Sequence, residues 1–536
     1  MDQPSRATRE ERRPWHERQG FRLPVALALL AVIVRALRWS WTAVMMNDGP
    51  IFIRLAQQMA DGDWRAALTY EFHPLYPFAV RVAQLLFGDW ERAAVAVSVL
   101  AGGIAVLGLF VLLRDAFDRR VAAIGGLLLA VHPVAIEQAD VQSDSLYLAF
   151  FVWSAAFLWR ALSRERAVPA LVAGLLAGLA YLVRPEGLGA LLVGLGVLAF
   201  ELARRHMRVS VAARMAGALC LGAALTMSPY VAFLSAQSGE LTITEKKSLA
   251  GVLGISALRA WATTGTVEYK PPKPIDPLLA ARPDLTPPPR GVRPFREKPV
   301  PTGLARYQAA ARNLASATFK ALRPEAALLL VLGLISARGR PGLRGLYFLT
   351  WTGLYLFVLL GLAANSAYVS RRHVFPPASL LLGYAALGVV LLSDRLARLP
   401  GLVRRIGASA AAAIPLVLVV ALGLGKALGP DRGNALAERR AAEWVSAQGG
   451  LAPGEGVAAV KQRVAYYARS PFVDLRRAPH PALLLPYLRR ERARYVIVDE
   501  RERAVLDALV AEQRDAVELR HEERASGHDA FVYEVR

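Results

Sequence analysis

Met46-Asn47-Asp48-Gly49-Pro50 places a carboxylate directly after the first long apolar run, residues 23–46, and just before an amphipathic segment. Further apolar runs near bilayer length follow along the chain, and they predict a polytopic membrane protein. An acid at the exit of a membrane span is either a hydrated loop residue or a functional group facing a cavity. Asp48 is therefore the first candidate for chemistry, and a hydrated loop acid is the alternative.

Composition supports this class. The chain has 536 residues, of which 54% are hydrophobic, too many for one soluble domain. The net charge of +22 comes mostly from arginines beside apolar runs, which favours contact with anionic membrane lipids over nucleic acid. Cys220 is the single cysteine, so no intrachain disulfide holds the parts outside the membrane together.

The apolar runs predict about eleven transmembrane helices. They lie near residues 23–46, 91–113, 121–136, 144–162, 168–183, 187–203, 211–236, 324–337, 345–363, 374–393 and 406–428. Arginines gather on one side of the short loops, which predicts a cytoplasmic N-terminus. Because the first run is long and lacks a convincing cleavage site, we expect an uncleaved first span.

The sequence predicts a polytopic α-helical membrane domain followed by a small α/β domain. The expected parts are a cytoplasmic tail (1–22), a transmembrane domain (23–429) with outer loops at 47–90 and 237–322, and an extracytoplasmic C-terminal domain (430–536). The middle of the 237–322 loop is rich in proline, and helices are expected near 246–261 and 302–320. This loop is expected to be a mobile lid or an acceptor surface.

The C-terminal region alternates short β-rich and helical patterns. Asn434 is expected to cap a helix that ends near Gln448. Strands are expected at 457–460, 495–498 and 531–535, and helices at 481–492 and 502–513.

The first outer loop carries several polar candidates. Residues 51–60 have the mixed face of a helix that lies along the membrane surface. Asp61-Gly62-Asp63 resembles a carboxylate pair that holds a divalent metal, although a hard cation needs more converging oxygens. His73, in His73-Pro74-Leu75-Tyr76-Pro77, is a candidate general acid or base, and a structural imidazole is the alternative.

The other outer loops combine acids with arginines on the side where orientation disfavours arginine. Glu137, Asp140 and Asp144 could bind a cation, line an acceptor groove or be hydrated. Arg184 precedes Pro185 at a broken helix end whose freed amides suit an anion. Pairing with Glu186, or contact with lipid headgroups, is the alternative for Arg184. Further cations on this side are Arg371 and Arg372.

These motifs resemble the type C glycosyltransferases that use polyprenyl-phosphate sugars, namely family 39, the protein mannosyltransferases and the aminoarabinose-type transferases. The resemblance covers about residues 23–395. It rests on Asn47-Asp48-Gly49, Gly62-Asp63-Trp64, His73–Pro77, Arg184–Gly187 and Tyr368–Pro377. Many relatives carry a paired Asp-Glu after the first span, whereas Gly49 follows Asp48 here.

The resemblance and the residue chemistry together predict transfer of a hexosyl or pentosyl group from a polyprenyl-phosphate donor to an acceptor glycan, lipid or protein. Inversion at the anomeric carbon and a location in the inner (plasma) membrane are implied by the family. Asp48 is expected to be the general base. The remaining expected roles are donor phosphate binding by Arg184, Arg371 and Arg372, donor binding by Tyr368 and His373, and accessory or acceptor contacts by His73, Asp144 and Glu186.

No cofactor is expected, and a need for divalent metal stays open. The competing classes are a transporter or flippase for a lipid-linked or anionic substrate, and a noncatalytic assembly subunit. Transporters place their charged residues near the midplane of the membrane, whereas the charges here lie at the outer ends of the predicted spans.

Overall fold

The computed structural model describes residues 22–246, 277–282, 303–337, 342–366, 369–429, 432–449, 451–512 and 516–536. Helices dominate the described part of the chain, and the strands lie near the C-terminus. The chain divides into two compact units. Of the described residues, those within 1–40, 55–256 and 307–429 form the helical unit, and those within 41–54, 257–306 and 430–536 form the sheet unit. The predicted fold class, a helical membrane protein with a small C-terminal α/β domain, is confirmed.

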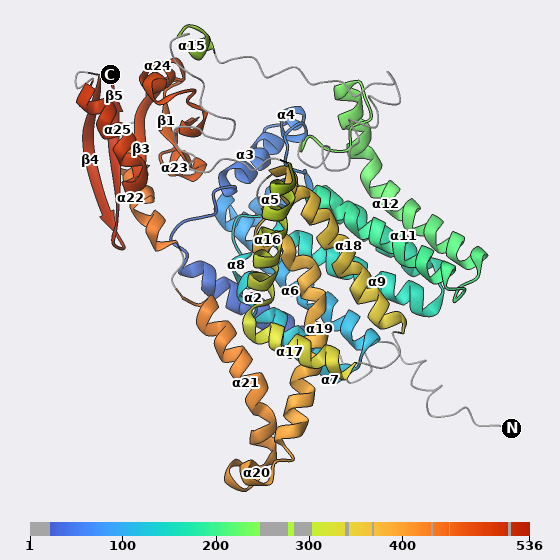
Figure 1. The fold of residues 1–536 in the computed structure, drawn as a ribbon. Helices are drawn as coiled ribbons and strands as arrows, with labels where there is room; N and C mark the ends of the chain where they lie inside the picture. Colours follow the sequence, from blue (N-terminus) through green and yellow to red (C-terminus); the bar gives the residue numbers. More distant parts are fainter. Residues whose placement is uncertain are drawn as a thin grey trace, which may run out of the picture. The chain divides into compact units, whose positions relative to one another are not determined.

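The helical unit is drawn from blue to orange in Figure 1. Its helices are α2 (Arg22–Ser40), α3 (Gly49–Ala60, which begins in the sheet unit), α4 (Trp64–Leu68), α5 (Leu75–Phe87), α6 (Trp90–Ala116), α7 (Arg119–Ala130), α8 (Pro133–Glu137), α9 (Asp144–Arg164), α10 (Ala167–Val183), η1 (Pro185–Gly187), α11 (Leu188–Ala203), α12 (Val209–Ser238), α16 (Gly303–Leu322, which also begins in the sheet unit), α17 (Pro324–Ser336), α18 (Leu343–Ser366), α19 (Arg371–Leu396), α20 (Pro400–Ile406) and α21 (Ala408–Ala427).

Each of the apolar runs predicted from the sequence overlaps at least one helix. Among the described residues, eight helical segments are long and apolar enough to cross a membrane: α2, α6, α9, η1 with α11, α12, α18, α19 and α21. Shorter apolar helices are α5, α10 and α17. The expected surface helix at residues 51–60 corresponds to α3.

Two predicted runs differ from the helices that form. The run 23–46 is helical only as far as Ser40, where α2 ends. The run 121–136 is divided at His132-Pro133 into α7 and α8, because proline disfavours a helical residue before it and cannot donate a backbone hydrogen bond. The His132 side chain caps α8 by accepting from the Val134 amide, with Nδ1 at 3.3 Å.

Glycines set the packing of α10 against α12. A Cβ atom on Gly174 would overlap the carbonyl oxygen of Leu219, and one on Gly222 would overlap the carbonyl oxygen of Leu171. Gly174 and Gly178 are spaced as in the small-residue motif that lets two membrane helices approach closely. The backbones of α10 and α12 therefore touch along this face, in the part of α10 that precedes Arg184.

The sheet unit contains a mixed sheet, red in Figure 1, with the strand order β2-β1-β3-β5-β4. Parallel pairs join β1 to β2 and β3, and antiparallel pairs join β5 to β3 and β4. Its elements are η2 (Gly433–Ala435), α22 (Leu436–Ala447), β1 (Gly456–Ala459), α23 (Gln462–Tyr467), β2 (Phe472–Asp474), η3 (Leu475–Arg477), η4 (Pro481–Leu483), α24 (Leu484–Arg490), β3 (Ala493–Asp499), α25 (Glu500–Glu512), β4 (Val517–Ala525) and β5 (His528–Val535).

The core of the sheet unit forms because residues alternate in direction along each strand. Val496 and Phe531 lie in one buried cluster with Leu484 and Leu488 of α24. The turn from β4 to β5 consists of Ser526 and Gly527, both with positive φ, as a two-residue type I′ hairpin turn requires.

Several predictions for this region need correction. The expected strands and helices are present, but β2 and β4 were not predicted. Asn434 does not cap α22: it lies within η2, and the residue that precedes α22 is Ala435. In the long loop 237–322, the expected helix near 246–261 lies almost entirely outside the described residues, whereas the expected helix near 302–320 is present as α16. The short helix α15 (Pro277–Ala280) belongs to the sheet unit, where Leu278 packs against its core.

Candidate functional site

Asp144 and Arg184 form the centre of a group of charged side chains in the helical unit. Asp144 begins α9, and Arg184 follows α10, where Pro185 ends the helix. The Arg184 Nη1 atom lies 2.5 Å from Asp144 Oδ1, and its Nε atom lies 3.5 Å from Glu186 Oε2. The break at Pro185 thus brings Arg184 and Glu186 together beside the first turn of α9.

Two further cations complete what we call the ion-pair cluster: Asp144, Arg184, Glu186, Lys246 and Arg372. Lys246 Nζ lies 3.3 Å from Glu186 Oε1, and Arg372 Nη1 lies 3.8 Å from Asp144 Oδ2. Arg372 also donates to Gln142 Oε1 at 3.1 Å. Three segments that are distant in sequence therefore supply cations to the same two carboxylates.

Exposure differs between the acids and the cations of the cluster. The side chains of Asp144 and Glu186 are each 5% exposed, whereas Arg184 is 14%, Arg372 22% and Lys246 27% exposed. Burial disfavours the charged guanidinium of Arg184, yet the carboxylates of Asp144 and Glu186 raise its pKa above the ordinary value. The cations of the cluster are therefore more accessible to solvent than its two carboxylates, which suits the cluster to an anion.

Contacts with aromatic rings restrict the Arg184 side chain of the cluster. The Arg184 guanidinium lies over the ring of Tyr147, with Cζ 5.9 Å from the ring centroid. The Tyr147 hydroxyl lies 2.7 Å from the hydroxyl of Tyr355 on α18. Since both tyrosines are buried, these contacts limit the directions in which the guanidinium can turn.

The other residues expected to bind the donor lie at the start of α19. Arg371 Nη2 lies 2.6 Å from Glu137 Oε2, so Arg371 is paired with a different acid from Arg372. His373 is part of a capping box with Ser370, in which its Nδ1 lies 3.2 Å from the Ser370 amide. Tyr368 lies outside the described residues.

His73 connects α10 with the segment that carries Lys246. Its Nδ1 lies 2.6 Å from the Tyr181 carbonyl oxygen and its Nε2 lies 3.1 Å from Thr244 Oγ1. Because a carbonyl only accepts, Nδ1 is the donor, and Nε2 accepts from the threonine hydroxyl. Burial lowers the pKa of His73 to about 4, so the imidazole is neutral at pH 7. Both ring nitrogens are engaged, which is the arrangement of a structural imidazole.

Asp48 belongs to the sheet unit, where it directly precedes α3. Its side chain is half-buried, and its carbonyl oxygen accepts from the Ile51 amide at 3.1 Å. The Gly49 amide donates to the Met46 carbonyl oxygen at 3.0 Å, which makes a tight turn around Asp48. The carboxylate is therefore carried by a defined turn at a helix start.

The Asp61-Gly62-Asp63 turn uses its second acid locally. Asp63 caps α4 by accepting from the Ala66 amide at 3.2 Å, and Gly62 has a φ of +85°. In the described part of the chain, no group of three or more His, Cys, Asp or Glu residues could hold a metal ion.

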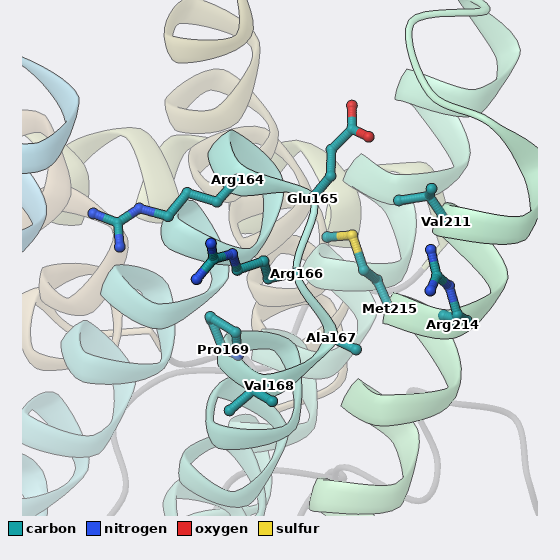
Figure 2. Close-up of a pocket in the computed structure, with 9 residues that line it drawn as sticks. All are labelled: Arg164, Glu165, Arg166, Ala167, Val168, Pro169, Val211, Arg214 and Met215. Atoms are coloured by element: carbon teal, nitrogen blue, oxygen red, sulfur yellow. The ribbon is translucent and has the colours of Figure 1, made fainter. Parts of the chain in front are cut away.

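A separate cavity of about 530 Å³ lies at the opposite end of α10 (Figure 2). Its lining residues are Arg164, Glu165, Arg166, Ala167, Val168, Pro169, Val211, Arg214 and Met215. Since a helix rises 1.5 Å per residue, the 17 residues of α10 separate this cavity from Arg184 by about 25 Å. Figure 2 shows Arg166 and Arg214 on different sides of the connecting chain, so they do not converge on one point.

Two contributors to the cluster escape sequence reasoning. Lys246 lies in the long loop, and only its neighbours Glu245 and Lys247 mark the position as polar. Tyr355 lies within an apolar run, where an aromatic residue is ordinary core. Asp144 is recognisable as a candidate, but its role as the shared partner of two arginines depends on pairing between distant segments.

Comparisons with known proteins agree with this fold. A family model described as dolichyl-phosphate-mannose-protein mannosyltransferase matches residues 73–233. The structure of AglB, the oligosaccharyltransferase of Archaeoglobus fulgidus, with an inhibitory peptide and a dolichol-phosphate is 14% identical, with a TM-score of 0.57 over 91% of this chain and 70% of that chain. A search of curated proteins gave no match.

ArnT from Cupriavidus metallidurans is similar over almost its whole length. Its structure bound to undecaprenyl phosphate is 14% identical, with a TM-score of 0.58 over 95% of this chain and 97% of that chain. The apo structure gives 15% identity and a TM-score of 0.55, with the same shares covered. The predicted resemblance is confirmed: the chain has the fold of the type C glycosyltransferases and is similar to the mannosyltransferase family over residues 73–233.

Proposed function

We propose that the protein transfers one sugar from a polyprenyl-phosphate donor to an acceptor hydroxyl at the outer face of the cytoplasmic membrane, with inversion of the anomeric carbon. The observation that carries the proposal is the ion-pair cluster, in which partly exposed cations pair with buried carboxylates. Similarity in fold to ArnT bound to undecaprenyl phosphate supports a lipid phosphate as the anion.

The cluster would serve the leaving group. As the bond between the anomeric carbon and the phosphate oxygen breaks, the electron pair leaves with that oxygen and negative charge develops on the phosphate. Arg184 and Arg372, already oriented by Asp144, would stabilise that charge without further rearrangement. Arg371 and Lys246 would add positive charge at the edge of the site.

Asp48 is the proposed general base. An acceptor hydroxyl is a weak nucleophile, so its proton must pass to a base as its oxygen bonds to the anomeric carbon. A carboxylate at a defined turn fits this role, and the protonated acid then returns the proton to solvent.

The direct test is release and transfer of sugar from a radiolabelled polyprenyl-phosphate donor by the purified protein in liposomes. Arg184→Ala should weaken donor binding about 10- to 100-fold, since one charge-assisted contact contributes about 1.5 to 3 kcal/mol. Arg120→Ala is a matched control, because Arg120 forms an exposed pair with Asp394. Movement of intact donor across the membrane without release of sugar would instead identify a flippase and overturn the proposal.

A further inference from the structure

The segment that precedes Asp48 is held by side chains from the C-terminal part of the sheet unit. Between the end of α2 at Ser40 and the start of α3 at Gly49, the backbone forms neither a helix nor a strand. The backbone N–H and C=O groups of such a segment do not pair within a helix or a sheet, so they need other hydrogen-bond partners. Val44 and Met45 are nonetheless 1% and 2% exposed, so their polar backbone groups are satisfied inside the protein.

Three arginines supply these partners to three consecutive carbonyl groups. Arg439 Nη1 donates to the Ala43 carbonyl oxygen at 2.5 Å, and Arg432 Nη1 donates to the Val44 carbonyl oxygen at 2.6 Å. Arg463 Nη1 donates to the Met45 carbonyl oxygen at 3.4 Å. The Met45 amide in turn donates to the Tyr467 hydroxyl at 3.0 Å.

We call Arg432, Arg439, Arg463 and Tyr467 the arginine clamp. Arg432 lies just before η2, Arg439 lies on α22, and Arg463 and Tyr467 lie on α23. Two helices of the sheet unit therefore contact the same segment, residues 43–45. Two members of the clamp also contact each other. The Arg439 guanidinium lies over the Tyr467 ring, with Cζ 4.7 Å from the centroid.

A buried acid orients the third arginine. Glu438, which is 5% exposed, accepts from Arg463 Nη2 at 3.4 Å and from Lys461 Nζ at 2.5 Å. Arg463 is itself 8% exposed and therefore has little freedom to turn. Charge-assisted hydrogen bonds between a fixed guanidinium and a carbonyl are among the stronger polar contacts in proteins.

We propose that the arginine clamp positions Asp48 for catalysis, so that the C-terminal domain is part of the catalytic apparatus. Asp48 follows Met45 by three residues, at most about 10 Å of chain, and the turn from Met46 to Gly49 shortens that reach. Holding residues 43–45 therefore fixes the origin of the Asp48 turn. A general base must lie within hydrogen-bond distance of the proton it accepts, so a displacement of about 1 Å can lower the rate about 100-fold.

This inference rests on the proposed function, in which Asp48 is the base. Its first test measures backbone exchange and does not require the protein to be active. Hydrogen–deuterium exchange of peptides covering residues 41–52 should be faster in Arg432→Ala and Arg439→Ala than in the wild type. Arg477→Ala is the matched control, since Arg477 is an exposed arginine of the same domain, with a side chain 76% exposed. Unchanged exchange in both clamp variants would overturn the clamp whether or not the protein transfers sugar.

The second arm asks whether the clamp acts through Asp48. In Arg432→Ala and Arg439→Ala, kcat should fall about 10- to 100-fold while the affinity for polyprenyl phosphate stays within twofold. Arg439→Lys, which keeps a donor, should recover part of kcat. In an Asp48→Asn background the clamp substitutions should cause no further loss of rate.

These results distinguish failure of the positioning role from failure of the proposed function. Faster exchange with an unchanged kcat, in a protein that needs Asp48, would reduce the clamp to a structural contact and overturn the positioning role. If the wild type transfers no sugar from any polyprenyl-phosphate donor, the proposed function fails, and the positioning role fails with it. The exchange arm still decides in that case whether the clamp holds the segment.

Discussion

Asp48 and Asp144 are both acids beside a membrane-length helix, yet they differ in their surroundings. Asp144 is nearly inaccessible, and two arginines neutralise it. Asp48 is half-buried at a helix start. A base must exchange a proton with substrate and solvent. The Asp144 carboxylate is 5% exposed and lies 2.5 Å from the Arg184 guanidinium, so its surroundings give it little access to either. The two acids therefore suit different tasks: Asp48 suits proton transfer and Asp144 suits orientation of cations.

Asp48→Asn should abolish sugar transfer while expression and donor binding stay near wild type. Amidation keeps the size of the side chain but removes the proton acceptor, which should cost about 10² to 10⁴ in rate. The measurement is single-turnover transfer by the purified variant. Asp61→Asn, at an exposed acid of the same loop, should retain activity. An undiminished rate in Asp48→Asn would assign Asp48 to topology.

Asp144→Asn should destabilise the protein and weaken donor binding together. Loss of a buried acid leaves Arg184 without its nearest countercharge, which should cost about 3 to 5 kcal/mol. The double variant with Arg184→Met removes both charges and should unfold at a higher temperature than Asp144→Asn alone. Thermal unfolding in detergent measures both. If the double variant loses the sum of the two single effects, the side chains are not coupled.

The sequence identifies the cations of the site better than their partners. Arg184, Arg371 and Arg372 stand out because orientation gives no reason for arginine at those positions. The role of Asp144 as a shared countercharge cannot be predicted locally, since Arg372 is 228 positions away in the chain. Lys246 is missed for the same reason, because its partner Glu186 is 60 positions away in the chain.

At the scale of elements, the contact between α10 and α12 controls where Arg184 lies. Gly174→Val should separate these helices, because its side chain would overlap the Leu219 backbone. We expect a lower unfolding temperature and weaker donor binding, since α10 leads directly to Arg184. Gly217→Val on α12 is the matched control, because a Cβ there meets nothing within 4 Å. Equal behaviour of the two variants would contradict the packing argument.

The start of α25 should make the C-terminal domain sensitive to pH. Burial, together with the charge of Asp499, raises the pKa of Glu502 to about 7, while Lys461 lowers it and Glu438 raises it. In the unfolded chain the carboxyl group titrates near 4.5. Between those two pH values the unfolded chain loses its proton first, so the domain loses stability as pH rises from about 4.5 to about 7.

Glu502→Gln should remove this dependence. Above pH 7 the variant should be more stable than the wild type by about 2 kcal/mol after allowance for solvent screening, and at pH 4.5 the two should be equal. Pulse proteolysis of the full chain in detergent, following the C-terminal fragment, measures the difference. Glu491→Gln alters an exposed glutamate of the same domain and serves as the control. Parallel pH curves for wild type and Glu502→Gln would contradict the assignment.

Helices were predictable from the sequence where apolar runs were long, and strands only where they were apolar. The strands β1, β3 and β5 are rich in buried residues. In contrast, β4 alternates charged residues on an exposed face, and β2 has only three residues. Neither carries a hydrophobic pattern of its own, because each forms by pairing with a strand that is already in place.

At the scale of the whole molecule, orientation in the membrane follows from the distribution of arginines in short loops. We expect residues 430–536 to share the extracytoplasmic side with Asp48. An alkaline phosphatase fusion at residue 480 should be active, and a fusion in the arginine-rich connection at residue 165 should be inactive. Cytoplasmic behaviour of the fusion at 480 would contradict the topology and remove an acceptor site outside the cell.

The charged face of β4 bears on whether copies of the protein associate with one another. In the strand order of the described sheet, β4 ends one side and leaves a row of backbone groups that could pair with a neighbouring molecule. Glu518, Arg520 and Glu522 interrupt that edge with side chains that lose hydration when another strand docks. Proteins confined to a bilayer meet one another in two dimensions, so such encounters are frequent. We therefore expect the edge of β4 to hinder strand pairing between copies of the protein at high surface density.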